Sequence, residues 1–244
     1  MNILVLSMDT EKGKDRRSIL NYDFKWIKSI EATQEIKDKF SFRYNIKEKK
    51  KTAIENTFAS HLNILKYIID NKLNNVIVNE DDAILDGNLN ALKDLKEATL
   101  LGGTLRHPSN WAKDTNWRKV NNIELKVGVN TIDYSKYRWT QIYSVYYPVW
   151  EEAKRIYDAV VGSGKYKHYD IFIAEKRLIK KLYYPSIFTH MDNIDKNKKY
   201  IKATSQIGSA QGIIKNYKIL GKDKTTFNNY NPFSSYSQPK GRVS

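Results

Sequence analysis

The spacing of apolar residues changes between two periods along the first part of the chain. Residues 2–8 form an apolar run that predicts a buried strand, residues 24–30 alternate as a strand does, and residues 76–78 predict a third strand. Residues 53–73 carry apolar side chains at helical spacing and predict the longest helix. The basic segment 11–20 predicts another helix, so strands and helices alternate.

The following segment continues this alternation and then loses it. Residues 89–97 predict a helix and residues 98–104 a short strand. Residues 105–137 show no clean period and predict a loop.

The pattern returns after this loop. Residues 137–150 predict a strand that ends at Pro148, where a helix through Val161 begins, because proline is tolerated in the first turn of a helix. Residues 169–182 predict a second helix and residues 183–190 a strand that ends at His190. Alternating strands and helices predict an α/β fold with a Rossmann-like, mainly parallel central sheet flanked by helices.

Composition adds the boundaries of the fold. Hydrophobic residues make up 41% of the 244 positions, enough for one domain with a real core. After Lys222 the chain is polar and poor in aliphatic residues. We therefore expect a single domain over residues 1–221 and a weakly ordered tail over residues 222–244.

Charge and cysteine content limit the partners. The chain has 42 Lys and Arg against 27 Asp and Glu, a net charge of +15, which attracts phosphates, nucleic acid or anionic membrane surfaces. An AT-biased genome explains a Lys- and Asn-rich composition equally well. With no cysteine, a metal needs oxygen or histidine ligands. No apolar run is long enough to span a bilayer, and the start does not resemble a signal peptide, so a cytoplasmic location is expected, in a bacterium or in a virus-infected host cell.

Three consecutive acids, Glu80, Asp81 and Asp82, follow the predicted strand 76–78. Ligands of α/β sheets bind outside the carboxyl ends of the strands, and the simplest compensation for three like charges is a divalent cation such as Mn²⁺ or Mg²⁺. Such a cation takes its remaining ligands from water and phosphates. The alternative is a solvated acidic turn in which Asp82 or Asp86 caps the next helix.

Several segments in order resemble glycosyltransferase family 25, which includes lipopolysaccharide and collagen galactosyltransferases. The segments are "DTEKGKDRRSIL" after the first strand, "WIKSIEAT", "ENTFASHLNILKYIIDNKLNNVIVNEDDAIL", "HYDIFIAEKRL", "YYPSIFTH" and "TSQIG". The resemblance covers roughly residues 2–208, and the block 53–85 is its most specific part. It implies a GT-A fold, a nucleotide-sugar donor such as a UDP-sugar, a divalent metal and inversion at the anomeric carbon.

The resemblance also implies roles for single residues. Asp82 would hold the metal, Asp81 would face the donor ribose or share the metal, and His190 is the candidate for a second metal ligand. A strand-end histidine bound by backbone groups is the alternative for His190. Arg16 and Arg17 would stabilise the leaving diphosphate, unless they are surface residues.

Inverting transfer also needs a base for the acceptor hydroxyl, and Asp170 is the candidate. Its alternative is a helix N-cap, a position that aspartate fills well. Asp133 and Asp192 are the reserves.

Two further groups of residues complete the predicted site. Asp9, Ala32 and Thr33 follow the first two predicted strands and are expected near the base and ribose of the donor. Trp111 and Trp117, together with Tyr137 and Trp139, offer flat apolar faces on which an acceptor sugar could stack. Core packing is favoured for Trp139 and Tyr143, and His61 is expected to be a helix residue that packs under the donor loop and not a ligand.

Three functions stay open on the sequence. The first is a metal-dependent inverting glycosyltransferase that moves a hexose to a glycan or glycoprotein, with no specific nucleic-acid partner and with UDP-galactose and UDP-glucose equally possible as donors. The second is a basic nucleic-acid-binding protein. The third is a transferase-like fold that binds the donor without turnover.

Overall fold

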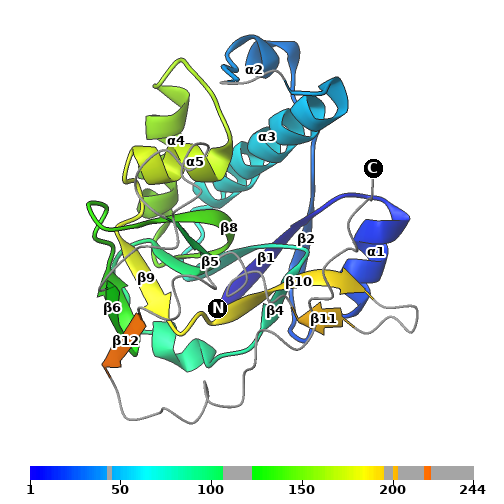
Figure 1. Ribbon diagram of the computed structural model, residues 1–244. Helices are drawn as coiled ribbons and strands as arrows, with labels where there is room; N and C mark the ends of the chain where they lie inside the picture. Colours follow the sequence, from blue (N-terminus) through cyan, green and yellow to red (C-terminus); the bar gives the residue numbers. More distant parts are fainter. Residues whose placement is uncertain (43–45, 107–122, 195–199, 203–216, 221–244) are drawn as a thin grey trace, which may run out of the picture.

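A mixed seven-stranded sheet forms the centre of the protein (Figure 1). The computed structural model describes residues 1–42, 46–106, 123–194, 200–202 and 217–220. The strand order is β2-β1-β3-β8-β5-β9-β7. In chain order the strands are β1 (Asn2–Ser7), β2 (Lys25–Lys28), β3 (Val76–Glu80), β5 (Thr99–Arg106), β7 (Gly128–Thr131), β8 (Arg138–Tyr147) and β9 (Lys181–Tyr184).

The strand directions set where the carboxyl ends meet. β1 is parallel to both β2 and β3, and β5 is parallel to β9. β8 lies antiparallel between β3 and β5, and β7 is antiparallel to β9 at the edge. Five of these seven strands therefore point the same way, and β8 and β7 point the other way. The ends of β2, β1 and β3 lie side by side at one edge of the sheet.

Two smaller sheets lie beside the central one. β4 (Ala83–Leu85) and β11 (Tyr200–Lys202) flank β10 (Phe188–Ile194) in a three-stranded sheet, and β12 (Tyr217–Leu220) pairs with β6 (Ile123–Lys126). Because β4 begins three residues after β3 ends, the chain turns directly from the central sheet into the small one. The acids 80–82 lie at this turn.

Helices cover the sheet on the side drawn uppermost in Figure 1, where α3, α4 and α5 lie together. The helices are α1 (Glu11–Ser18), α2 (Gln34–Asp38), α3 (Glu48–Asp70), α4 (Trp150–Val161) and α5 (Tyr169–Glu175), and a 3₁₀ turn, η1 (Leu89–Leu92), lies below the sheet. Within the described residues no helix is both long and apolar enough to cross a membrane.

The alternation of side chains along the strands builds a core on each face of the sheet. Leu4 and Leu6 of β1 belong to the core under α3 and α4, whereas Ile3 and Val5 belong to the core on the opposite face. The helix side buries apolar residues of α3, including Phe58, because they recur at helical spacing. The predicted α/β architecture with a central sheet flanked by helices is confirmed at this level.

Several predicted elements are wrong in type or extent. Residues 89–97 form only the short turn η1 instead of a helix. Their apolar residues Leu89, Leu92 and Leu95 are spaced by three, which matches the period of a 3₁₀ helix, and the backbone bonds Lys93 N–H to Asn90 O and Leu95 N–H to Leu92 O span three residues. The spacing of the leucines by three residues therefore agrees with a 3₁₀ turn and not with an α-helix.

The predicted helix 169–182 ends early, at Glu175. Arg177 adopts a left-handed φ of 53°, and the Leu178 N–H bonds back to Ile173 O, which closes the helix as a Schellman-type cap does. The predicted strand 183–190 is divided between β9 and β10, with Pro185 between them. Both differences arise because residues 181–184 pair with β5 and β7 and residues 188–190 pair with β4. Local periodicity does not report such pairing with distant strands.

Two more predictions meet different outcomes. The expected loop 105–137 contains the strands β6 and β7, and its residues 107–122 lie outside the described part. The longest helix is the predicted one, but it begins at Glu48 instead of residue 53. The predicted tail, residues 222–244, also lies outside the described residues.

A close approach at Gly102 generates a stability prediction. A Cβ at Gly102 would lie 2.2 Å from the Tyr143 ring, so β5 can pack against this ring only because residue 102 has no side chain. We expect Gly102→Ala to lower the free energy of unfolding in urea by about 1–3 kcal/mol, the usual cost of overpacking.

The double variant provides the control for this prediction. In a Tyr143→Leu background the smaller side chain leaves room for the new methyl group, so Gly102→Ala should cost less there than in the wild type. Equal losses in both backgrounds would contradict the assigned contact.

Candidate functional site

The acids 80–82 lie where β1 and β3 end. Leu6 is paired with Glu80 across these parallel strands, so the residues that follow each strand reach the same edge of the sheet. Ser7 Oγ donates a hydrogen bond to Asp81 Oδ2 at 2.6 Å. Asp81 is thereby fixed to the end of the neighbouring strand.

Helix α1 brings Arg16 to two of the three acids. The Arg16 Nη1 atom lies 2.7 Å from Asp81 Oδ1 and 3.2 Å from Asp82 Oδ2. The helix can approach this closely because Gly13 has no side chain. A Cβ at this position would lie 2.1 Å from Met8 O. Burial opposes the charged form of Arg16, but the Asp82 and Asp81 carboxylates outweigh it and raise the Arg16 pKa. Arg16 thus bridges both aspartates.

Arg17 contacts the strand ends rather than the acids. Its Nη1 donates to Ser7 Oγ at 2.5 Å and to Met8 O at 2.8 Å. Its guanidinium lies 4.0 Å from the centroid of the Trp26 ring, and Trp26 Nε1 donates to Ser7 O at 3.1 Å. Arg17 therefore ties α1 to the ends of β1 and β2.

Strand β10 brings His190 to Asp82. His190 is paired with Ala83 in the antiparallel pairing of β10 with β4, and its Nε2 lies 3.1 Å from Asp82 Oδ2. Asp82 Oδ1 is buried and has no hydrogen-bond partner among the described residues. The two residues predicted to share a metal are in direct contact, and one carboxylate oxygen remains available.

A partly buried chain of hydrogen bonds supports the backbone at this turn. Ser144 Oγ donates to Asn79 Oδ1 at 2.7 Å, Asn79 Nδ2 donates to Tyr22 Oη at 3.0 Å, and Tyr22 Oη donates to Ala83 O at 2.7 Å. Burial raises the pKa of Tyr22, with Asp82 and Asp81 adding to the effect. The phenol therefore stays protonated and donates to the residue directly after the acids.

Glu80 points to a different partner from its two neighbours. His61 Nε2 of α3 lies 3.0 Å from Glu80 Oε1, and the His61 ring stacks on Tyr169 with a centroid distance of 4.2 Å. Although 33% of the Glu80 side chain is exposed, burial of its carboxylate raises its pKa, and Asp82 and Asp81 raise it further, while His61 lowers it. His61 is a buried residue of α3 that stacks on Tyr169 of α5 and also holds Glu80 of β3.

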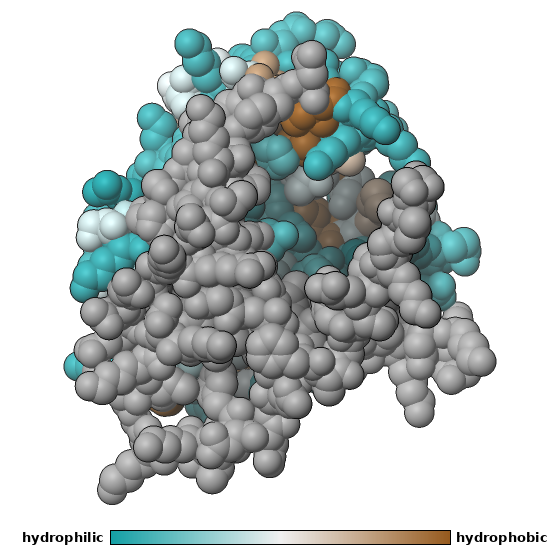
Figure 2. Space-filling model, viewed as in Figure 1, coloured by the Kyte–Doolittle hydropathy of each residue, from teal (hydrophilic) through white to brown (hydrophobic). Residues whose placement is uncertain are grey.

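A cavity of about 490 Å³ lies between α3, α5 and the strand ends. Three of the four histidines of the chain line it, with both acidic and aromatic neighbours. Figure 2 shows a hollow on this face of the molecule, with hydrophilic and hydrophobic residues in its walls. The lining residues on which the site depends are His61, Glu80, Tyr169, Asp170 and His190.

Asp170 lies in the first turn of α5 and lines this cavity. Its Oδ2 accepts the N–H of Gln141 at 2.8 Å, and its Oδ1 accepts the N–H of Ile171 at 2.8 Å. Gln141 has a left-handed φ of 50°, so Asp170 stabilises a strained backbone position in β8. The N-cap position of α5 is His168, so Asp170 is not the helix N-cap that its alternative describes; it holds the backbone of Gln141 and faces the cavity.

His168 lines the same wall as Asp170. Burial lowers the pKa of His168, nearby Lys50 lowers it further, and Asp170 opposes both effects. The imidazole is therefore biased towards its neutral form, in which it can accept a hydrogen bond.

The residues predicted to bind the donor base have partners outside the acidic cluster. Asp9 is exposed and forms an ion pair with Lys28 at 3.2 Å. Ala32 is buried, and its N–H donates to Asn56 Oδ1 at 2.9 Å. Thr33 caps α2. None of these contacts joins them to the acids.

The predicted acceptor residues and the reserve bases have separate outcomes. Trp111 and Trp117 lie outside the described residues. Tyr137, Trp139 and Tyr143 are buried, which confirms core packing for the last two and removes Tyr137 as an exposed stacking surface.

The two reserve bases have different outcomes. Asp133 accepts the N–H of Ser135 at 3.0 Å, and Ser135 lowers the pKa of Asp133. Asp133 thus stabilises a turn and does not line the cavity. The side chain of Asp192 lies outside the described part.

Sequence reasoning missed the contact of Glu80 with His61 and the supporting chain through Tyr22. The signal for His61 is its position: it falls on the buried face of α3, between Phe58 and Leu65, where a titratable side chain needs a partner. No comparable signal marks Tyr22, because its partners come from β3 and β4.

The carboxylate oxygen of Asp82 suits a hard divalent cation. Asp82 offers a buried, unpartnered oxygen, and His190 offers an imidazole nitrogen at the same carboxylate. No group of three or more acidic or histidine side chains in the described parts of the chain is arranged as a complete metal site. Mg²⁺-type ions keep several waters and phosphate ligands, so a pair of protein ligands is compatible with Mg²⁺ or Mn²⁺.

No family model matches the chain, and no curated protein matches it.

The raised pKa of Glu80 predicts how one substitution changes stability with pH. An unfolded Glu titrates near 4.5, and the folded state holds its proton to a higher pH. The folded state therefore binds more protons in this window and loses stability as pH rises through it. We expect Glu80→Gln, which keeps an oxygen for His61, to raise Tm at pH 7 in EDTA and to lose this advantage below about pH 4.5.

Glu35→Gln is the opposite control. Glu35 is exposed, and its hydrogen bond and ion pair with Lys39 lower its pKa. This variant should therefore show no gain at pH 7. A Glu80→Gln protein that is less stable than the wild type at pH 7 would contradict the raised pKa of Glu80.

Proposed function

We propose that the protein is a metal-dependent inverting glycosyltransferase that moves a hexose from a nucleotide sugar, such as a UDP-sugar, to a glycan or glycoprotein. The proposal combines the resemblance to glycosyltransferase family 25 with the arrangement of acidic and basic groups at the strand ends. The mixed α/β sheet is compatible with the GT-A fold that this resemblance implies.

One observation carries the proposal: the proposed metal ligand His190 and the proposed base Asp170 line the same cavity. They come from different elements, since His190 belongs to β10 of the three-stranded sheet and Asp170 belongs to helix α5. The cavity between them has a volume in the range of small-molecule sites. A donor sugar held there would have the diphosphate on one side and a carboxylate on the other.

Asp82 and His190 would hold the divalent cation, and Asp81 would serve mainly to position its neighbours. Both oxygens of Asp81 already have partners, Ser7 and Arg16, whereas Asp82 Oδ1 has none among the described residues. The bound cation would neutralise charge on the leaving diphosphate.

The transfer itself would be a single displacement. The Asp170 carboxylate accepts the proton of the acceptor hydroxyl, the hydroxyl oxygen forms a bond to the anomeric carbon, and the bond from this carbon to the phosphate oxygen breaks. The electron pair of the broken bond leaves with the nucleoside diphosphate, whose growing charge Arg16 stabilises. Attack opposite to the leaving group inverts the anomeric carbon.

The donor base stays assigned to the ends of β1 and β2, near Asp9, Ala32 and Thr33, and the acceptor to Trp111 and Trp117. The assignment of Arg17 to the diphosphate has less support than that of Arg16, because Arg17 is held by Ser7, Met8 and Trp26.

Binding of UDP tests the site directly. We expect calorimetric titration to show UDP binding in Mn²⁺, and loss of at least about tenfold in affinity both in EDTA and in Asp82→Ala, because each removes the link to the diphosphate. Asp94→Ala, at an exposed aspartate, is the matched control and should bind as the wild type does. Binding that ignores both the metal and Asp82 would overturn the metal assignment.

No UDP binding under any of these conditions would instead favour the nucleic-acid alternative. A titration with oligonucleotides at several salt concentrations would then test it, since phosphate contacts make the affinity fall steeply with salt.

Asp170→Asn separates catalysis from binding. The amide keeps an oxygen for the Gln141 N–H but cannot accept the acceptor's proton, so we expect UDP affinity to stay within about twofold and transfer to fall by about 10²–10⁴. Donor turnover is measured as UDP release with a panel of acceptors. Unchanged turnover would show that Asp170 only supports the backbone of Gln141. A wild type with tight UDP binding and no turnover across the panel would support the third function, a donor-binding fold.

A further inference from the structure

Arg16 lies between the two aspartates at the place where a cation would be needed. Its Nη1 atom is 2.7 Å from Asp81 Oδ1 and 3.2 Å from Asp82 Oδ2, and its side chain is 20% exposed. The same Asp82 Oδ2 also faces His190 Nε2 at 3.1 Å. The guanidinium therefore neutralises carboxylate oxygens of Asp81 and Asp82, the residues proposed to hold the metal.

One oxygen at this place has no partner. Asp82 Oδ1 is buried, and its side chain is 10% exposed, yet no described group donates to it. A buried carboxylate oxygen without a partner is costly, which points to a ligand that completes it. Arg16 satisfies one side of Asp82 and leaves this one open.

We propose that Arg16 acts as a substitute cation, which occupies the acidic site in the ligand-free protein and moves to the diphosphate when metal and nucleoside diphosphate bind together. This inference rests on the proposed function. A metal alone must displace Arg16 from two carboxylates, which leaves a largely buried guanidinium without its partners. A metal that arrives with a diphosphate brings phosphate oxygens, to which a guanidinium binds well.

The consequence is coupling between the two ligands. Metal alone binds weakly, because Arg16 competes with it, and the diphosphate removes the competitor. Each ligand therefore raises the affinity of the other, as linkage requires. The free protein keeps its acids neutralised, and the site takes up the cation mainly together with a nucleoside diphosphate.

Helix α1 suits this role. It has eight residues, Thr10 caps its start, and Arg16 lies in its last turn, at the opposite end from the cap. Arg17, the next residue, remains bound to Ser7 Oγ, Met8 O and the Trp26 ring, so the helix stays attached when Arg16 turns away. The movement needs only a change of side-chain rotamer at Arg16.

Binding of Mn²⁺, measured by the electron paramagnetic resonance signal of the free ion, tests the proposal with and without UDP. We expect Arg16→Gln to bind Mn²⁺ alone about tenfold more tightly than the wild type. The factor by which UDP tightens Mn²⁺ binding should be smaller in Arg16→Gln than in the wild type. Mn²⁺ should also raise the Tm of Arg16→Gln more than that of the wild type.

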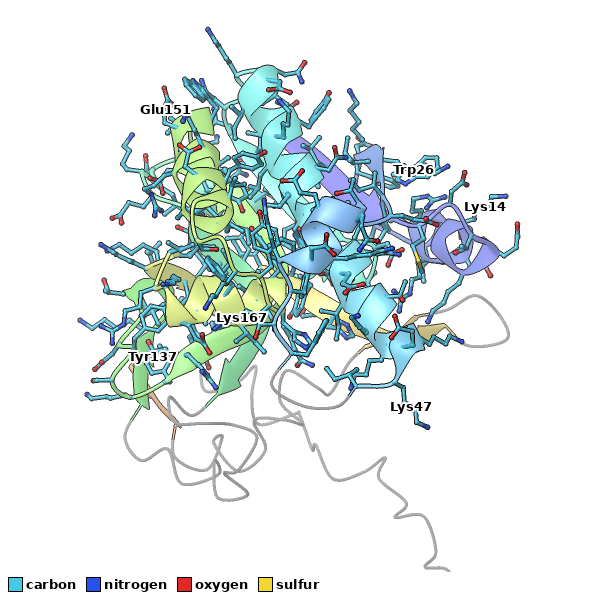
Figure 3. All side chains as sticks on the ribbon, turned by 90° about the horizontal axis from the view of Figure 1, so that it is seen from above. Lys14, Trp26, Lys47, Tyr137, Glu151 and Lys167 are labelled. Atoms are coloured by element: carbon cyan, nitrogen blue, oxygen red, sulfur yellow. The ribbon has the colours of Figure 1, made fainter. Side chains whose placement is uncertain are left out.

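Three further variants make the result specific. Lys14→Gln removes the same charge from the periphery of α1, where Lys14 pairs with Glu11 at 3.1 Å, and should leave Mn²⁺ affinity unchanged (Figure 3). Arg16→Lys keeps the charge without the planar fork and should bind Mn²⁺ with intermediate affinity, which tests the proposal even where Arg16→Gln fails to fold. Asp82→Ala should not bind Mn²⁺.

The outcomes separate this inference from the proposed function. Mn²⁺ affinity that is equal or weaker in Arg16→Gln overturns the role of Arg16 and leaves the metal site standing. Absence of Mn²⁺ binding in every variant, with or without UDP, overturns the metal assignment and this inference together.

Discussion

The site depends on keeping three adjacent carboxylates apart and neutralised. Residues 80–82 carry like charges in a partly buried place, where repulsion is stronger than in water. The end of β3 and the turn into β4 send the three side chains to different partners. Glu80 meets His61, Asp81 meets Ser7 and Arg16, and Asp82 meets Arg16 and His190. Each partner comes from a different element, so the acids hold several parts of the fold together.

The core determines whether these partners arrive. Helix α3 lies on the sheet through its buried apolar face, and this packing fixes His61 beside Glu80. Two glycines help to position the other partners of the acids. Gly13 lets α1, with Arg16, lie against the end of β1, and Gly102 leaves room for the Tyr143 ring, whose centroid lies 5.4 Å from that of the His190 ring. Apolar packing therefore sets the electrostatics of the site, and a change in the core would alter the charges that reach the acids.

Sequence patterns predicted the parts of this arrangement that are locally encoded. The segments that form the strands β1, β3 and β8 and the long helix α3 have clear apolar patterns, and the structure contains all four elements. Predictions failed where pairing with a distant strand overrides the local pattern, as in residues 176–184, or where apolar spacing by three was taken for a helix, as in residues 89–97. The residues after β1 and β2 were grouped by chain position, yet Asp9 pairs with Lys28 of β2 and Thr33 caps α2, and neither of these contacts reaches the acids.

The sequence by itself determined that an α/β sheet ends in a cluster of acids, because hydrophobic period and charge are properties of neighbouring residues. It also pointed to Arg16, His190 and Asp170 as residues of interest, through resemblance to a family. Only the tertiary structure decided that Arg16 bridges two carboxylates, that one Asp82 oxygen is left without a partner among the described residues, and that Asp170 and His190 share a cavity. These facts depend on distances between elements far apart in the chain, which are set by packing and strand order rather than by local sequence.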